Sequence, residues 1–267
     1  MNETNIKISD LSAERIMSHI GSCSDISTIS VLETVDSTNT YAKKLAASGA
    51  KSGTVVIANH QTAGRGRLGR SFYSPESTGL YMSLLIRNEH APLDPSALTI
   101  AAGVAVCRAI NTVCGKTPQI KWVNDIFLDS KKVCGILAEA GTDSGVLSYI
   151  IVGIGLNVST QIFPGELQSI AASLGENINR SVIAGEIIKE FYELRPLCGT
   201  QELINEYKSL SLILGKKITF TQDGTEYCGI ASDINIEGNL LVRLDNSKTV
   251  TLQSGMISLG SGNFTNI

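Results

Sequence analysis

The most unusual stretch of the sequence is a segment rich in glycine and arginine, Gly64-Arg65-Gly66-Arg67-Leu68-Gly69-Arg70. Arginine side chains are planar, permanently charged forks that hold carboxylates and phosphates. The glycines let backbone N–H groups approach a ligand closely, and they prevent a stable helix or strand here. The segment therefore predicts a loop that becomes ordered around an anionic small molecule. An exposed basic loop without a ligand, or an RNA-binding Arg-Gly segment, explains it equally well.

Two motifs with lysines, further along the chain, could act on the same anion. In Lys121-Trp122-Val123-Asn124-Asp125, a lysine and an aspartate four apart in a strand can lie near each other at its end. The lysine could neutralise a phosphate, and the aspartate could hold Mg²⁺ through oxygen. One lysine of Lys131-Lys132, which precedes an apolar strand, could enter a pocket and meet a carboxylate. Taken alone, an ordinary strand end and a solvated hairpin turn explain these motifs at least as well.

A fourth motif, Asp36-Ser37-Thr38-Asn39, offers hydrogen-bond donors and acceptors to a polar ligand. The same residue types also cap helices, because their side-chain oxygens accept from free backbone N–H groups. Since a helical pattern follows from Thr40, helix capping is the better interpretation of this motif by itself.

Together, the order and spacing of these motifs resemble the biotin–protein ligase family over most of the chain, from Ile29 to Leu259. The agreement includes shorter pieces that lie between the four motifs. The matching pieces are Asp36–Asn39, Gln61 with Ala63–Arg67 and Gly69-Arg70, Ser74-Pro75, Leu80–Ser83, Lys121–Asp125 apart from position 123, Lys132 with Gly135–Leu137, and Gly153–Asn157. Chance does not produce agreement at so many ordered positions.

The resemblance implies a biotin site, in which Ser37, Thr38 and Asn39 contact the ureido ring, whose N–H and C=O groups need partners in a buried pocket. Lys132 would hold the carboxylate of biotin and then the acyl-phosphate oxygens. Arg67 would lie in a ligand-ordered loop above them, so Lys132 and Arg67 are the expected catalytic pair. The expected biotin contacts are Ser37, Thr38, Asn39, Gln61, Gly64, Arg65, Gly66, Arg67, Lys132 and Gly135.

The resemblance also implies a site for ATP with Mg²⁺, for which Asp125 is the expected metal ligand. The expected nucleotide contacts are Arg70, Phe72, Lys121, Asn124, Asp125 and Asn157. The biotin carboxylate would attack the α-phosphorus of ATP and expel pyrophosphate. A lysine of a biotin carboxyl carrier protein would then attack biotinyl-5′-AMP and expel AMP. No covalent enzyme intermediate is needed, so catalysis would rest on positioning and charge stabilisation.

Three positions depart from the family pattern: Val123 where Pro is usual, Phe72 where Trp is frequent, and Cys134 where Ala is common. Val123 would let the strand continue, and Phe72 keeps a ring for stacking on adenine.

Three alternative functions remain: a lipoate–protein ligase of the same fold, a non-catalytic nucleic-acid-binding module, and an inactive biotin sensor. The polar Ser37–Asn39 motif argues against lipoate, whose pocket would favour an apolar tail.

The elements that must position these motifs follow from hydrophobic periodicity. The expected helices are Ala13–Ile20, Thr40–Ala47, residues 97–110, Ser181–Leu194 and Thr200–Ser209. The expected strands are Ile29–Leu32, Thr54–Ala58, Leu80–Ile86, Ile120–Val123, Ile126–Leu128, Val133–Glu139 and Tyr149–Asn157, followed by Lys217–Thr221, Glu226–Ile230, Leu240–Leu244 and Thr249–Leu252. The last four strands are short and separated by turn signals, a pattern typical of a small barrel.

The expected fold class is therefore α+β. A catalytic domain with a mixed sheet, of the biotin/lipoate ligase type, would span residues 1–214, and a small SH3-like β-barrel would span residues 215–267. The segment before the first matching strand, about 28 residues, is too short for a helix-turn-helix domain, so no DNA binding is expected.

Composition narrows the class of protein further. The 22 Lys and Arg residues against 25 Asp and Glu give a formal charge of −3, which disfavours a protein that coats nucleic acid. Six cysteines and three histidines show no metal-binding spacing, which indicates free thiols in a reducing compartment. The polar N-terminus lacks a secretion signal, and no apolar run is typical of a membrane span. We therefore expect a cytoplasmic protein without a membrane partner, as a monomer or a homodimer.

Overall fold

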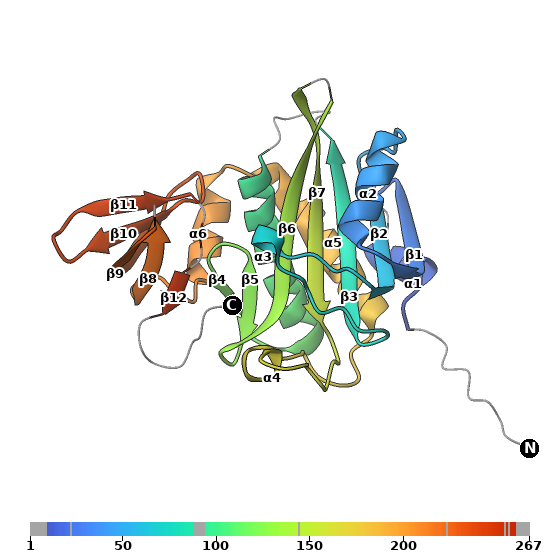
Figure 1. The fold of residues 1–267 in the computed structure, drawn as a ribbon. Helices are drawn as coiled ribbons and strands as arrows, with labels where there is room; N and C mark the ends of the chain where they lie inside the picture. Colours follow the sequence, from blue (N-terminus) through green and yellow to red (C-terminus); the bar gives the residue numbers. More distant parts are fainter. Residues whose placement is uncertain are drawn as a thin grey trace, which may run out of the picture.

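The computed structural model describes residues 10–21, 23–87, 94–143, 145–222, 224–253, 255 and 257–259. Seven strands form the central sheet: β1 Thr28–Val35, β2 Thr54–Gln61, β3 Gly79–Arg87, β4 Gln119–Lys121, β5 Asp125–Leu128, β6 Lys131–Asp143 and β7 Val146–Asn157. Their order in space is β1-β2-β3-β7-β6-β5-β4 (Figure 1). β1 and β2 are parallel and the other neighbours are antiparallel, so the sheet is mixed.

Helices cover both faces of this sheet, because its strands carry apolar side chains on alternate faces. On one face, helix α2 (Thr38–Ala47) packs Ala42 and Ala46 against Val56, Leu85 and Ile151. The opposite face carries the larger core. Its helices are α1 Ala13–Ile20, α3 Pro95–Cys114, α5 Arg180–Leu194 and α6 Gln201–Ser209 (Figure 1). The short helix α4, Leu167–Ile170, contributes no residue to this core and contacts β6.

Helix α3 is the central helix of the larger core. The Asp94 side chain caps it by accepting from Ser96 N at 2.8 Å, Pro95 occupies its first turn, and it ends at Gly115 with a left-handed φ of 63°. By length and composition alone α3 is apolar enough to cross a membrane, but most of it is buried among α5, α6 and the sheet. Burial on several sides explains why its apolar residues are not confined to one stripe.

A second, antiparallel sheet follows at the C-terminal side. Its strands are β8 Lys217–Gln222, β9 Thr225–Ile234, β10 Leu240–Leu244, β11 Thr249–Leu252 and β12 Ile257–Leu259, in the order β11-β10-β9-β8-β12. Polar contacts of side chains join it to the rest of the molecule: Trp122 Nε1 donates to Gly238 O at 2.9 Å, and Lys208 Nζ lies 2.6 Å from Asp233 Oδ1. The C-terminal sheet therefore packs beside the β4–β5 end of the central sheet.

The expected α+β class with a mixed sheet is confirmed, and most element boundaries lie within a few residues of those expected. One expectation is wrong: the strand predicted over Ile120–Val123 ends at Lys121, and Trp122–Asn124 form a turn in which the Trp122–Val123 peptide bond is cis. Val123 therefore does not continue the strand. The reason is that the carbonyl groups of this turn bond elsewhere, Val123 O to the Tyr207 hydroxyl at 2.8 Å and Asn124 O to Ile136 N at 2.9 Å.

Four short elements were not anticipated from the sequence: α4, β12 and the 3₁₀ helices η1 (Arg67–Gly69) and η2 (Arg195–Leu197). Each has four residues or fewer, so periodicity gives no signal for them. The first nine residues of the polar N-terminus, His90 and Asp223 of a predicted turn lie outside the described residues.

Candidate active site

A polar pocket lies where the start of α2 meets the end of β2. Its lining residues are Ser37, Thr38, Asn39, Gln61, Arg65, Phe72, Gly135, Leu137, Gly153, Ile154 and Gly155. Ser37 occupies the N-cap position of α2, but its side chain makes no capping hydrogen bond. The expectation that capping explains the Asp36–Asn39 motif is therefore wrong, because Ser37, Thr38 and Asn39 are buried and line the pocket instead.

Hydrogen bonds hold the polar side chains of this pocket in place. Gln61 Oε1 accepts from Thr38 N at 2.8 Å, and Gln61 Nε2 donates to Ser74 Oγ at 2.9 Å. Ser83, which is fully buried on β3, donates to Asn39 Oδ1 at 2.6 Å. A network fixed in this way is preorganised to receive a polar ligand ring.

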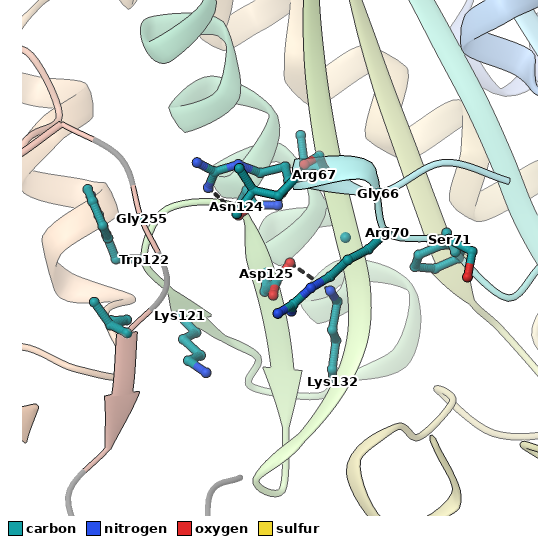
Figure 2. A pocket seen from close by; sticks show the side chains of 15 residues that line it. Gly66, Arg67, Arg70, Ser71, Lys121, Trp122, Asn124, Asp125, Lys132 and Gly255 are labelled. Atoms are coloured by element: carbon teal, nitrogen blue, oxygen red, sulfur yellow. Dashed lines mark hydrogen bonds and ion pairs between the residues drawn. The ribbon is translucent and has the colours of Figure 1, made fainter. Parts of the chain in front are cut away.

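A cationic pocket adjoins the polar one (Figure 2). Its lining residues are Gly66, Arg67, Leu68, Arg70, Ser71, Phe72, Lys121, Trp122, Asn124, Asp125, Lys132, Gly135, Ile136, Gly255 and Ile257. The β4–β5 hairpin pairs Lys121 directly with Asp125, so these residues face each other across two strands and do not share one strand as expected. Four cationic side chains against one carboxylate make this pocket a site for anions.

Lys132 and Arg67 each contact a polar side chain of the cationic pocket. Lys132 Nζ lies 2.8 Å from Asp125 Oδ1. Within the described part of the chain this oxygen has no partner in hydrogen-bond geometry, so the contact is an ion pair without an aligned hydrogen bond. Arg67 Nη1 donates to Asn124 Oδ1 at 2.9 Å, as Figure 2 shows. The Arg67 guanidinium group therefore connects the glycine-rich loop to the turn after β4.

Lys121 shows how strongly positive this pocket is. Burial lowers the pKa of Lys121, the charges of Lys132 and Arg70 lower it further, and Asp125 opposes them. A bound polyanion would relieve this repulsion, so its binding would favour the charged form of the lysine.

A third, mostly apolar pocket lies beyond Lys132. Its lining residues are Ser71, Phe72, Tyr73, Lys132, Asn157, Phe163, Leu167, Ile170 and Ala171. Asn157 Nδ2 donates to Ala172 O at 3.1 Å, but Asn157 Oδ1 is buried and has no hydrogen-bond partner among the residues that the structure describes. Leaving a buried acceptor unpaired costs about 1–3 kcal/mol, so a ligand N–H at this point would be favoured.

The three pockets meet at one side chain, because Phe72 lines all of them. Its ring lies close above Gly135 and Gly155, and it packs edge-on against Tyr81 at a centroid distance of 6.5 Å. Lys132 lines both the cationic and the apolar pocket. One elongated ligand could therefore pass from the polar through the cationic to the apolar pocket.

Residues 31–157 match the model of the biotin/lipoate A/B protein ligase family, and residues 213–260 match that of the biotin protein ligase C-terminal domain. The bifunctional ligase/repressor BirA of Bacillus subtilis is 37% identical over 85% of this chain and 73% of its own length. The biotin–[acetyl-CoA-carboxylase] ligase of Mycobacterium tuberculosis is 31% identical over 88% of this chain and 90% of its own. The chain belongs to the biotin protein ligase family.

A solved structure of a biotin protein ligase agrees with this assignment. The enzyme from Aquifex aeolicus, in complex with biotin and ATP, is 28% identical, with a TM-score of 0.76 over 88% of this chain and 99% of its own. The family and fold expected from the sequence motifs are thus confirmed.

In this member of the family, most residues expected at the site line one of the three pockets. Those in the polar pocket are Ser37, Thr38, Asn39, Gln61, Arg65 and Gly135, and those in the cationic pocket are Gly66, Arg67, Arg70, Lys121, Asn124, Asp125 and Lys132. Asn157 lies in the apolar pocket, and Phe72 borders more than the nucleotide side assigned to it. Gly64 lines none of the three: a Cβ there would lie 2.4 Å from Phe72 O, so Gly64 permits the loop to fold onto Phe72.

Sequence reasoning gave no role to several residues that the fold brings to the site. Ser83, Gly153 and Gly155 lay inside matching motifs, so a signal for them existed. Glu139 had only a weak signal, namely a carboxylate in the apolar strand β6. Ile257 of β12 lines the cationic pocket and could not have been found without the position of the C-terminal sheet.

Proposed function

We propose that this chain activates biotin with ATP to give biotinyl-5′-AMP and pyrophosphate, and then transfers the biotinyl group to a lysine of a biotin carboxyl carrier protein. The observation that carries the proposal is the meeting of three pockets at Phe72. Biotinyl-5′-AMP has a polar ureido ring, a central phosphate and an aromatic base. The three pockets offer hydrogen-bonding groups, positive charge and an apolar cleft in the same order.

In the first step, a carboxylate oxygen of biotin attacks the α-phosphorus of ATP, and the bond to the β-phosphate oxygen breaks. Two anions must approach each other, so the site has to offset their repulsion. Lys132 and Arg67 are the groups that we propose for this task, because both line the cationic pocket next to the polar one. Lys132 would exchange its ion pair with Asp125 for contacts to the acyl-phosphate oxygens.

Mg²⁺ would enter this site with the phosphates of ATP. Asp125 is the carboxylate that lines the cationic pocket, and among the described residues no group of three His, Cys, Asp or Glu side chains comes together to hold a metal ion. Mg²⁺ is often bound by one or two carboxylates together with substrate phosphates, which fits a single aspartate here. We therefore propose that Asp125 contributes one ligand and the nucleotide contributes the others.

For the base of ATP we propose the apolar pocket. Phe163, Leu167 and Ile170 provide flat contact for an aromatic ring. The exocyclic amine of adenine is a hydrogen-bond donor, which is what the unpaired Asn157 Oδ1 lacks. Phosphates in the cationic pocket would then connect the base to the reacting carboxylate.

In the second step, the amine of the carrier lysine attacks the acyl carbon of biotinyl-5′-AMP, and AMP leaves with the electron pair of the broken C–O bond. The names of the relatives support biotin over lipoate or nucleic acid as the ligand. We also propose residues 1–214 and 215–267 as the two domains and the cytoplasm as the compartment, where all six cysteines would stay free thiols, as they are in the structure.

The test is incubation of the purified protein with ATP, Mg²⁺ and either biotin or lipoate, followed by addition of a carrier domain. We expect pyrophosphate release with biotin only, and a gain of one biotinyl group in the mass of the carrier. Release with lipoate but not biotin would assign the protein to lipoate ligation. Biotin binding without pyrophosphate release would identify a sensor, and salt-dependent RNA binding unaffected by biotin would favour the nucleic-acid module.

A further inference from the structure

The Glu139 carboxylate lies behind the polar pocket and gathers three side chains. Its Oε1 is 2.7 Å from Lys43 Nζ and 3.1 Å from Arg65 Nη2, and its Oε2 accepts from Asn39 Nδ2 at 2.8 Å. These partners come from helix α2 and from the glycine-rich loop, whereas Glu139 itself stands on β6. The Glu139 side chain is only 15% exposed, so these contacts are largely shielded from solvent.

Glu139 is held in its charged form. Burial by itself would raise the pKa of this carboxyl, but the hydrogen bonds from Lys43 and Asn39 together with the positive charges of Lys43 and Arg65 hold the pKa below its ordinary value. A charged carboxylate can only accept hydrogen bonds. Near neutral pH, Glu139 is therefore an acceptor for each of its neighbours.

This fixes the orientation of the Asn39 amide. Asn39 Nδ2 faces Glu139 Oε2 and also Leu137 O at 3.3 Å, both of which are acceptors. A flipped amide would bring its oxygen against these two oxygens, so the flip is disfavoured. Asn39 Oδ1 must consequently face Ser83, and because an amide oxygen carries no hydrogen, Ser83 must donate to it.

The orientation of the Asn39 amide determines the direction of the hydrogen bonds that the Ser83 and Thr38 hydroxyl groups make. Ser83 Oγ lies 2.6 Å from Asn39 Oδ1 and 2.8 Å from Thr38 Oγ1, but a serine has a single hydrogen to donate. When Asn39 takes that hydrogen, Ser83 cannot donate to Thr38, and the hydrogen of Thr38 is directed to Ser83 Oγ or to Gln61 Oε1, which lies 3.2 Å from Thr38 Oγ1. Thr38 Oγ1 then keeps its lone pairs, and it can only accept a hydrogen bond from a ligand.

We infer that Glu139 is a positioning residue for the proposed biotin pocket: through Asn39 and Ser83 it makes Thr38 a hydrogen-bond acceptor, so the pocket requires an N–H group of the ligand there. This inference rests on the proposed function and deepens it. The cyclic urea of biotin carries two N–H groups, whereas the dithiolane ring of lipoate carries none. Selection between the two acids is thus set partly by a carboxylate outside the pocket lining.

Sheet register explains how the network is assembled. Ser83 on β3 pairs with Gly153 on β7, which in turn pairs with Leu137 on β6. Asn39 lies directly over this row, since a Cβ at Gly153 would be 2.2 Å from Asn39 Oδ1. Glu139, two residues after Leu137, emerges on the same face of β6. The absence of a side chain at Gly153 is what lets Asn39 reach both Ser83 and Glu139.

The primary test is Glu139→Gln, with biotin binding measured by calorimetry and the KM and kcat of pyrophosphate release measured in parallel. Glutamine can donate as well as accept, so Asn39 is free to flip. We expect the Kd and KM for biotin to rise about tenfold, as for loss of one buried hydrogen bond between the ligand and Thr38, while kcat and the KM for ATP change little. Desthiobiotin, which keeps the cyclic urea but lacks the sulfur, should show the same loss.

Glu190→Gln is the matched control. Glu190 is also mostly buried, at 12% exposed, and it is ion-paired at 3.0 Å, with Arg108 in the helical core away from the pocket. Its variant should lose thermal stability to an extent similar to Glu139→Gln but bind biotin as the wild type does. Equal effects of the two variants on biotin binding would overturn the inference, because a general loss of stability would then explain both.

A pair of exchanges gives a second test, in which the charge moves from one residue to its neighbour. Asn39→Asp alone places two carboxylates side by side and should weaken biotin binding more than tenfold. Asn39→Asp combined with Glu139→Gln restores one acceptor at position 39 and one donor at position 139, so the double variant should bind biotin about tenfold more tightly than Asn39→Asp. Losses that simply multiply in the double variant would overturn the inference.

The outcomes separate this inference from the proposed function. A wild-type protein that binds no biotin would refute the proposed function itself. Wild-type binding of biotin with unchanged affinity in Glu139→Gln would refute only the positioning role of Glu139.

Discussion

The floor of the polar pocket is built from glycines, and Gly155→Ala tests this directly. A Cβ at position 155 would lie 2.7, 2.9 and 3.0 Å from three carbons of the Phe72 ring. Carbon atoms in contact are normally about 3.5 Å apart, so the ring would have to move by roughly 0.8 Å. Phe72 borders all three pockets, and it also packs edge-on against Tyr81, so the movement has to change the shape of the site.

The size of the effect follows from the cost of overpacking. An extra methyl group in a packed region typically costs about 1–3 kcal/mol. If the ring is displaced into the polar pocket, this cost opposes biotin binding, and the Kd rises by a factor of about 5 to 150. If instead the surrounding core shifts, the cost lowers the free energy of unfolding, and the melting temperature falls by about 2–4 °C per kcal/mol. Because the ring borders open pockets, we expect the binding effect to be the larger one.

Calorimetric titration with biotin, together with thermal unfolding, separates these two effects. Gly103→Ala is the control, because a Cβ at this position of α3 meets its nearest side-chain atom at 3.4 Å, an ordinary contact. It should bind biotin normally and gain up to about 1 kcal/mol in stability, since glycine is unfavourable within a helix. Wild-type binding and melting by Gly155→Ala would refute the packing of Phe72 over the pocket floor.

Three further predictions concern the cationic pocket, the apolar pocket and the scaffold. Lys132→Met should lower kcat for biotin-dependent pyrophosphate release by about 10²–10³-fold with a smaller change in biotin Kd, and a loss below threefold would remove Lys132 from the reaction. Asn157→Ala should raise the KM for ATP about tenfold, because the adenine amine would lose its acceptor. It should also weaken the preference for ATP over GTP, because in the wild type the O6 oxygen of guanine would face the Asn157 Oδ1 oxygen. Unchanged nucleotide kinetics would contradict the placement of the base. Burial alone would raise the pKa of Asp10, but hydrogen bonds from the buried Arg180 outweigh it and lower that pKa. The stability from this pair is thus complete above the ordinary Asp pKa and is lost as the pH falls through the lowered one. Asp10→Ala should lower the free energy of unfolding by about 2–3 kcal/mol at neutral pH, a value already reduced for the partial exposure of Asp10. The melting temperature of the variant should also fall less steeply than that of the wild type as the pH is lowered. An unchanged fall at acid pH would exclude the Asp10–Arg180 pair as its cause.

Much of the chemistry of this protein was determined by the sequence. The glycine-rich loop, the Lys121–Asp125 motif and Lys132 were expected to act on an anion, and they line one cationic pocket. Such motifs are legible because glycine, arginine and lysine have their special properties wherever the chain places them. Long elements such as α3 were equally clear, since periodicity within one segment reflects its own burial.

Only the tertiary structure decided what surrounds these motifs. Asn39 and Glu139 are a hundred positions apart in the chain, and their contact depends on the register of β3, β7 and β6. For the same reason the Asp36–Asn39 motif was misjudged as a helix cap: local propensity favours capping, but the pocket side chains Gln61 and Ser83 offered closer partners to Thr38 and Asn39. Sequence patterns report on neighbours along the chain, whereas a ligand pocket is made by neighbours across a sheet, where a shift of one residue turns a side chain to the opposite face.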